Sequence, residues 1–360
     1  MSGLHFHSLR VRAINPDAGD ALIVSFDIPE DLAEHYSFTP GQYLTLRQTI
    51  GGREERRSYS ICAALDDGEL RVGVRLVPGG VFSGWMHEHL KHGDTLEVMP
   101  PQGRFTTRID AHARRHVLGI AGGSGITPII SIAKSLLERE PNSRFTLIYG
   151  NKRSGSTMFK EELEDLKNRF LTRLSLFPVF SREQVDSPLG TGRLDRAKLG
   201  EILASGVVHL PGISEAFICG PFGMNDEAEA ALRDAGLAPE RIHVERFGVP
   251  PSAEEAALHA PRPGDARGAV ITVVRDGLTR EIEYLNDDPS ILDAAARAGM
   301  DVPYSCKSGV CGTCRAKLME GQVRMDRNFA LEKGEVESGF VLTCQAHPLT
   351  DKVCVSFDER

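Results

Sequence analysis

The chain has 360 residues, of which 41% are hydrophobic, 26% charged and 6% aromatic. This length predicts two or three domains, and the composition is typical of a globular protein. The formal net charge of −8 argues against a nucleic-acid partner, because surfaces that bind phosphate backbones are usually basic. The sequence holds no run of eighteen apolar residues and no apolar signal segment near its start. We therefore expect no membrane association and a cytoplasmic location.

The first domain is expected over residues 1–106. Short alternating stretches separated by glycine and proline predict a small antiparallel β-barrel, with strands near 7–12, 21–26, 43–47, 71–76 and 95–99. Within this domain, the segment Arg57-Ser58-Tyr59-Ser60 offers a guanidinium, an aromatic ring and a hydroxyl. An ordinary barrel strand has the same letters, so the segment alone is weak evidence. Further on, residues 79–83 open a helix whose first turn would suit a phosphate.

A second domain is expected over residues 107–248, where strands alternate with helices. The strands are predicted near 116–121, 144–149, 174–180 and 216–219, and the helices near 127–137, 159–170 and 225–235. This alternation is typical of a parallel sheet with helices on its faces.

Two glycine-bearing turns in this second domain point to a dinucleotide. The turn from Gly119 to Pro128 follows an apolar strand and opens a helix, with Thr127 expected as the N-cap and Pro128 as the first helical residue. Cys219-Gly220-Pro221 ends another strand. Two such ends in one parallel sheet would line a dinucleotide crevice, although each also fits an ordinary tight turn.

Residues 249–268 are expected to be a linker, and residues 269–360 a third domain. The linker is rich in proline and glycine and poor in large apolar residues. In the third domain, Asp288-Pro289-Ser290 is expected to start a helix that closes at Gly299.

Four cysteines in the third domain give the strongest signal in the chain. Cys306, Cys311 and Cys314 have the spacing C-x4-C-x2-C, and Cys344 follows after 29 residues. This is the plant-type [2Fe–2S] pattern, in which small residues let a tight loop bring three thiolates together. A zinc site is the alternative, but zinc sites usually contain paired C-x2-C segments. Cys354 lies on an alternating stretch and is expected to be a buried structural thiol.

The order of these motifs resembles that of the ferredoxin–NADP reductase superfamily, followed by a plant-type ferredoxin. The resemblance covers nearly the full chain and rests on the segments at 57–60, 80–83, 103–105, 122–128 and 219–221. It implies a multidomain fold in which an antiparallel β-barrel flavin domain precedes an α/β parallel-sheet nucleotide domain and a β-grasp ferredoxin domain. The activity that it implies is that of the reductase component of a multicomponent oxygenase.

The resemblance also implies a role for particular residues. Those expected to bind FAD are Arg57, Tyr59, Ser60, Gly80 and Ser83, with Ser60 near the flavin N5. Those expected to face the nicotinamide dinucleotide are Gly122, Gly123, Gly125 and Thr127. Cys219 would lie near the reacting nicotinamide carbon, and Glu245 and Phe247 would flank the flavin. The residues expected to take part in the reaction itself are Ser60, Cys219 and Glu245.

The choice of coenzyme is expected to depend on Ser181-Arg182. In relatives, a Ser-Arg pair after this strand binds the 2′-phosphate of NADPH, whereas an NAD site would prefer an acidic residue on the ribose. The alternative is a solvated loop, and the neighbouring Glu183 weakens the argument. NADPH is therefore expected in preference to NADH.

The expected reaction converts one two-electron transfer into single-electron transfers. A hydride passes from NADPH to FAD, and electrons then pass singly through the cluster to an external oxygenase. The oxygen chemistry would require a di-iron site on that partner, because the only Glu-x-x-His pair here is Glu240 with His243. Two alternatives are a reductase for another mono- or dioxygenase and a non-catalytic zinc-bearing binding module.

Overall fold

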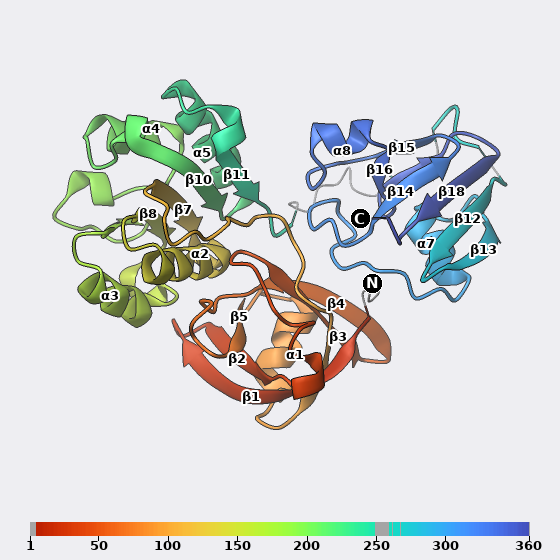
Figure 1. The fold of residues 1–360 in the computed structure, drawn as a ribbon, viewed down its shortest axis with the longest axis horizontal. Helices are drawn as coiled ribbons and strands as arrows, with labels where there is room; N and C mark the ends of the chain where they lie inside the picture. Colours follow the sequence, from red (N-terminus) through yellow and green to blue (C-terminus); the bar gives the residue numbers. More distant parts are fainter. Residues whose placement is uncertain (1–4, 249–258, 261, 267, 360) are drawn as a thin grey trace. The chain divides into compact units, whose positions relative to one another are not determined.

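The computed structural model describes residues 5–248, 259–260, 262–266 and 268–359. The chain forms two compact units, one over residues 6–247 and the other containing residues 248–360 (Figure 1). No helix within the described ranges is both long and apolar enough to cross a membrane.

The structure describes every residue from 6 to 247. The first half of this unit forms a closed antiparallel sheet. Its strand order is β4-β3-β6-β1-β2-β5. A bridge between Ile61 and Val72 joins the two outer strands, and this closure makes the sheet a barrel. The helix α1 (Val81–His89) buries Phe82 and Met86 in the same core. The strand bounds are β1 (His7–Asp17), β2 (Ala21–Asp27), β3 (Tyr43–Ile50), β4 (Arg53–Ser60), β5 (Leu70–Arg75) and β6 (Thr95–Val98).

The second half of this unit is a parallel sheet with the strand order β11-β10-β7-β8-β9. Because the chain moves outward from β7 in both directions, the strand order reverses between β7 and β10. Ligands of open α/β sheets bind beyond the carboxyl ends of the strands at such a reversal. The strand bounds are β7 (His116–Gly122), β8 (Arg144–Asn151), β9 (Leu174–Phe180), β10 (Ile213–Cys219) and β11 (Ile242–Glu245).

Helices cover both faces of this sheet, as the alternation along its strands requires. On β7, Val117 and Ala121 pack in the core with α2 and α3, whereas Leu118 and Ile120 pack in the core with α4 and α5. The helix bounds are α2 (Ile126–Arg139), α3 (Lys160–Arg169), α4 (Arg196–Ala204) and α5 (Phe222–Asp234). Helix α4 was not predicted, because its short sequence follows a loop and has weak apolar periodicity.

The barrel and the parallel sheet share a core and a group of buried charges. Helix α2 packs against Cys62 and Phe105 of the barrel half. On the same helix, the Lys134 ammonium lies 2.7 Å from Asp67 and 2.5 Å from Glu162, and only 7% of its side chain is exposed. Arg71 on β5 also pairs with Glu162 at 2.5 Å. The two halves are therefore held by specific polar contacts as well as by apolar packing.

The unit that contains residues 248–360 has a mixed sheet with its own core, as expected for a β-grasp fold. The strand order is β13-β12-β18-β14-β16, with β12 and β18 parallel and the other pairs antiparallel. Helix α7 (Ile291–Arg297) buries one face in this core, and the Ser290 side chain caps it. The other bounds are β12 (Val270–Arg275), β13 (Leu278–Glu283), β14 (Arg315–Glu320), β15 (Val323–Met325), α8 (Lys333–Glu337), β16 (Phe340–Leu342), β17 (Ala346–Pro348) and β18 (Lys352–Ser356).

Half of the expected linker, residues 249–258, lies outside the described residues. The part that is described contacts the C-terminal unit. Arg324 pairs with Asp265 at 2.6 Å, and the Ala266 amide donates to the Pro348 carbonyl at 2.9 Å. Asp265 and Ala266 of the expected linker are thus bound to the domain that follows them.

The buried charges on α2 predict a large loss of stability on substitution of Lys134. In Lys134→Met, Asp67 loses its closest cation and Glu162 loses one of its two cations at 2.5 Å, so the free energy of unfolding should fall by about 3 kcal/mol. The measurement is urea denaturation followed by the fluorescence of Trp85, the single tryptophan, which lies in this unit.

The control is Arg139→Met on the same helix. Arg139 pairs with Asp66, and the two side chains are 45% and 49% exposed, so the loss should stay below about 1 kcal/mol. Equal losses in the two variants would contradict the assigned role of Lys134.

Candidate functional site

The segment expected to bind flavin lies at the end of β4. Period-two alternation places Arg57 and Tyr59 on one face of the strand and Ser60 on the other. The Tyr59 ring lies 6.1 Å from the Phe82 ring, and burial raises the pKa of its hydroxyl. Arg57 has a half-exposed side chain near Glu55, and Ser60 is buried. A guanidinium, a ring and a hydroxyl thus occur within four residues, which suits a flavin with its phosphate.

The second flavin segment forms a turn into α1. Gly80 is the N-cap residue, and a Cβ atom there would lie 2.7 Å from the Ser83 hydroxyl. That hydroxyl accepts a hydrogen bond from the Val77 amide at 3.1 Å, and Ser83 is buried. In this structure Ser83 therefore stabilises the turn, and Gly80 leaves the space for it.

The two glycine-bearing turns meet at the reversal point of the parallel sheet. A Cβ atom on Gly125 would lie 2.0 Å from the Cys219 carbonyl oxygen, and one on Gly122 would lie 2.6 Å from the Met224 sulfur. Gly123 adopts a positive φ of 53°. The glycines expected to face a dinucleotide therefore also permit a close approach between the end of β7 and the end of β10.

The predicted start of helix α2 was wrong by two residues. The helix begins at Ile126 after Gly125, so Thr127 and Pro128 lie within its first turn. The Thr127 hydroxyl donates to the Ser124 carbonyl at 3.0 Å and therefore binds the Gly-rich turn itself. A 3₁₀ turn at Gly123–Gly125, which single-residue preferences do not reveal, moves the helix start.

Cys219 and Glu245 lie side by side at the ends of β10 and β11. They are paired in the parallel register, and Cys219 is fully buried. Burial, and to a smaller extent the Glu245 charge, raise the pKa of the Cys219 thiol, which therefore stays protonated. Asn225 on α5 donates to the Glu245 carbonyl at 3.0 Å, while its buried Oδ1 accepts no bond from the residues that the structure describes. That orphaned acceptor suits a donor group of a bound nucleotide.

Arg75 is a site residue that the sequence analysis missed. It lies at the end of β5 in the barrel, and its guanidinium is 3.3 Å from the Cβ position of Gly123 in the nucleotide half. It donates to the Ser156 carbonyl at 2.6 Å and pairs with Asp20 at 3.1 Å. A cation beside a glycine-rich turn favours a pyrophosphate. The contact depends on tertiary structure, so no local motif could have revealed it.

The segment expected to select the coenzyme follows β9. Ser181 and Arg182 are exposed, and their amides donate to the carbonyls of Asn151 and Lys152 at 2.9 Å each. The Glu183 carboxylate accepts a bond from the Ser154 amide at 2.8 Å. The acidic neighbour is thus engaged with a turn, while the basic side chain next to it reaches solvent.

Phe247 is 47% exposed and follows β11 after one intervening residue, Arg246. An exposed ring of this size at the carboxyl edge of the sheet is compatible with the flavin contact that the family resemblance implies. His243, in contrast, stacks on Phe217 at 4.7 Å and lies 3.5 Å from Glu215, so it serves the packing of the nucleotide half.

Four of the five cysteines of the C-terminal unit lie close together. Cys306, Cys311 and Cys314 lie on the loop between α7 and β14, and Cys344 follows β16. The Ser308 amide donates to the Cys306 sulfur at 3.4 Å, and Cys311 contacts the Thr313 hydroxyl at 3.2 Å.

The same sulfurs interact with one another in two pairs. A hydrogen bond from Cys311 and further bonds from backbone amides lower the pKa of Cys306 to about 5, whereas donating that proton raises the pKa of Cys311. A hydrogen bond to Cys344, together with burial, raises the pKa of Cys314. Two hydrogen-bonded pairs of sulfurs, with backbone amides directed at Cys306 and Cys311, fit the ligand set of an iron–sulfur cluster. Cys354 is only partly buried on β18, so the expectation of a buried thiol was wrong.

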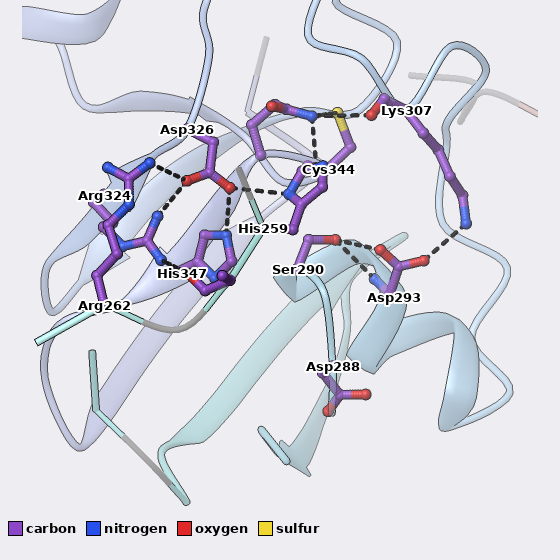
Figure 2. A network of polar contacts seen from close by, with 12 residues as sticks. His259, Arg262, Asp288, Ser290, Asp293, Lys307, Arg324, Asp326, Cys344 and His347 are labelled. Atoms are coloured by element: carbon purple, nitrogen blue, oxygen red, sulfur yellow. Dashed lines mark hydrogen bonds and ion pairs between the residues drawn. The ribbon is translucent and has the colours of Figure 1, made fainter. Parts of the chain in front are cut away.

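A buried carboxylate, Asp326, lies close to this loop in sequence and contacts two histidines and two arginines (Figure 2). One of its oxygens accepts from His259 at 2.9 Å and from His347 at 2.7 Å, and the other pairs with Arg262 at 3.3 Å and also with Arg324. Two histidines and a carboxylate could hold a metal ion, but two guanidinium groups already neutralise the carboxylate. The group is therefore an ion-pair network that binds His259 and Arg262 to the C-terminal unit.

These features define a flavin- and iron–sulfur-containing oxidoreductase that uses a nicotinamide nucleotide, and comparisons with known proteins agree. Residues 9–107 match the oxidoreductase FAD-binding domain family, residues 120–230 the oxidoreductase NAD-binding domain family, and residues 273–349 the 2Fe-2S iron-sulfur cluster binding domain family. The chain is 46% identical to a subunit of the 1,2-phenylacetyl-CoA epoxidase of Escherichia coli (strain K12), over 99% of this chain and 98% of that one.

More distant relatives have the same domains. A 3-ketosteroid-9-alpha-monooxygenase ferredoxin reductase component of Rhodococcus rhodochrous is 32% identical over 97% of this chain and 96% of its own. The structure of phthalate dioxygenase reductase shares the fold, with a TM-score of 0.58, 22% identity and 98% of each chain covered. The chain belongs to the ferredoxin–NADP reductase-type reductases with a C-terminal [2Fe–2S] domain, which transfer electrons from NAD(P)H through FAD and the cluster to an oxygenase. The family resemblance, the three-part fold and the enzyme class are confirmed, and the zinc-bearing alternative is not.

The close approach at Gly125 predicts a large effect of one added methyl group. In Gly125→Ala, the new Cβ would collide with the Cys219 carbonyl, so the free energy of unfolding should fall by about 3 kcal/mol or more. The affinity for NADPH should fall with it, because the two strand ends must separate. Trp85 fluorescence in urea and equilibrium binding of NADPH measure the two effects.

Gly155→Ala is the matched control. No atom lies within 4 Å of a Cβ at that position, in the loop after β8, so its cost should stay below about 0.5 kcal/mol. A Gly125→Ala protein as stable as this control would show that the strand ends do not need the glycine.

Proposed function

We propose that the oxygenase served by this reductase is a phenylacetyl-CoA epoxidase. The observation that carries the proposal is the 46% identity to the E. coli epoxidase component over nearly the whole of both chains, against 32% to the ketosteroid monooxygenase component. The partner would hold the di-iron centre that oxygen activation requires, since this sequence has a single Glu-x-x-His pair. Seven cysteines without a disulfide among the described residues support a reducing, cytoplasmic location. The net charge of −8 supports the absence of a nucleic-acid partner, and we propose no membrane partner.

We also propose the residues that hold each group. Arg57 would neutralise the flavin phosphate, Tyr59 would pack on the ring system, and Ser60 would hydrogen-bond near N5. Gly80 would admit the phosphates to the first turn of α1, where Ser83 stabilises the backbone. Phe247 would cover the flavin from the edge of the parallel sheet.

On the nucleotide side, backbone amides of the turn Gly122–Gly125 would bind the pyrophosphate, with Arg75 as an added cation and Thr127 holding the turn. Cys219 would pack as a neutral thiol against the nicotinamide, and Glu245 beside it would orient the ring. FAD, when bound, supplies the step from a two-electron hydride to single electrons. The residues of this chain would hold the nicotinamide ring against the flavin ring and exclude water from between them.

The cluster would be held by Cys306, Cys311, Cys314 and Cys344. We propose domain boundaries at 1–106, 107–248 and 269–360, with 249–268 as the connection. The matches to three separate families, at 9–107, 120–230 and 273–349, support these boundaries.

The acceptor is tested by reconstitution with purified oxygenases. With NADPH and phenylacetyl-CoA, the protein should support epoxidation by the oxygenase part of the E. coli epoxidase at a rate close to that of its native reductase component. The oxygenase of the 3-ketosteroid-9-alpha-monooxygenase system is the control, and we expect at least about tenfold slower turnover with it, a difference of about 1.4 kcal/mol. Faster turnover with the steroid oxygenase would reject the proposed acceptor.

NADPH is the proposed coenzyme in preference to NADH. Support comes from the exposed basic side chains Arg182, Lys152 and Arg153 at the carboxyl edge of the sheet. Since Glu183 is engaged by the Ser154 amide, it does not offer the free carboxylate that an NAD ribose would use.

Arg182→Ala should lower kcat/KM for NADPH by about tenfold to a hundredfold, as the loss of one charge-assisted contact to a phosphate would. The value for NADH should change less than twofold, because NADH has no 2′-phosphate. Arg114→Ala is the control, since Arg114 is exposed before the amino end of β7, at the opposite edge of the sheet. Equal losses with both coenzymes would overturn the proposed preference.

A further inference from the structure

Gln345 is a fully buried amide next to a proposed cluster ligand. It follows Cys344 directly, and 1% of its surface is exposed. Its side-chain nitrogen Nε2 lies 2.9 Å from the Lys307 carbonyl oxygen, 3.0 Å from the Cys344 carbonyl oxygen and 3.7 Å from the Cys344 sulfur. A primary amide has two protons, so three acceptors compete for two N–H groups.

The surrounding structure fixes this amide from several sides. The Gln345 backbone amide donates to the Leu342 carbonyl, and its carbonyl accepts from the Asp326 amide, both at 2.9 Å. Its Cγ atom lies 3.2 Å from the Cβ position of Gly309 in the cysteine loop. Gln345 therefore contacts the cysteine loop on one side and Asp326 of the ion-pair network on the other.

We propose that Gln345 raises the reduction potential of the cluster by directing a side-chain N–H group at the Cys344 sulfur. An added electron increases the negative charge on the ligand sulfurs, and N–H groups directed at them stabilise that charge. A distance of 3.7 Å suits a hydrogen bond to sulfur, whose radius is larger than that of oxygen. The inference rests on the proposed ligand role of Cys344.

A purely structural role is the competing explanation. The bond from Gln345 to the Lys307 carbonyl would then do no more than hold the cysteine loop against β17. Removal of the amide would lower stability or cluster content and leave the potential unchanged. The midpoint potential of the cluster therefore separates the two explanations.

The experiment compares Gln345→Met and Gln345→Glu with the native protein, each as the full chain loaded with FAD and cluster. Met has a similar length and no N–H group, and Glu replaces the donor with a negative charge. The midpoint potential is measured by redox titration, with the electron paramagnetic resonance signal of the reduced cluster as the readout. Met should lower the equilibrium constant for reduction about tenfold, which corresponds to about 59 mV for one electron, and Glu should lower it further.

Gln322→Glu is the matched control. Gln322 is exposed between β14 and β15 in the same unit, so this variant adds the same charge without removing a donor near a sulfur. In Gln322→Glu, the equilibrium constant for reduction of the cluster should stay within about twofold of the native value, because solvent screens exposed charges. The proposal would be overturned by an unchanged midpoint potential in Gln345→Met, or by a shift in Gln322→Glu as large as that in Gln345→Glu.

Measuring the iron and sulfide content of each protein separates a failure of the proposed role of Gln345 from a failure of the proposed cysteine ligands. Native protein without two irons and two sulfides per chain would refute the cluster ligands themselves. If the Met and Glu variants lose iron, Gln345→Asn distinguishes the two explanations. Asn keeps the side-chain amide, but its side chain is one methylene shorter, so the amide lies farther from the Cys344 sulfur. A lowered midpoint in Gln345→Asn supports the proposal, whereas a native midpoint, or iron loss from a folded Asn variant, overturns it in favour of the structural role.

Discussion

The nucleotide half depends on the close approach of two strand ends. A Cβ atom at position 125 would lie 2.0 Å from the Cys219 carbonyl oxygen, a distance at which no side chain fits. The glycine therefore allows β7 and β10 to end together at the point where the strand order reverses. The same small residue places the glycine-rich turn, the proposed dinucleotide site, next to Cys219. Packing and the proposed binding thus impose the same requirement on one residue.

A second constraint joins the barrel to this sheet. Lys134 on α2 is nearly buried between two carboxylates, one from the barrel and one from α3. Buried charges of this kind contribute little net stability compared with apolar residues, but they tolerate few alternative arrangements. Hydride transfer requires the reacting atoms to approach within about 3–3.5 Å in a defined orientation. A shared core with a specific ionic contact suits that requirement better than apolar packing alone.

Local patterns predicted much of this molecule, and long-range contacts account for what they missed. The cysteine spacing and the glycine-rich turn are local, because a tight loop or turn dictates its own residues. Arg75, in contrast, reaches the Gly123 turn from the barrel, and Gln345 reaches Lys307 across 38 residues. The start of α2 was misplaced because a 3₁₀ turn precedes it. Helix α4 was missed because its apolar residues show little periodicity.

The C-terminal unit holds its redox site by a different strategy. Its core is built from its own residues, and Asp326 binds the incoming segment through His259 and Arg262. The backbone amide of Asp326 also donates to the backbone carbonyl of Gln345, and the side-chain amide of Gln345 lies near the Cys344 sulfur. Single-electron transfer does not require atomic contact between donor and acceptor, so this unit can be compact on its own. What it must control is the charge around four sulfurs, and buried amides achieve that control without adding a charge that would itself need a partner.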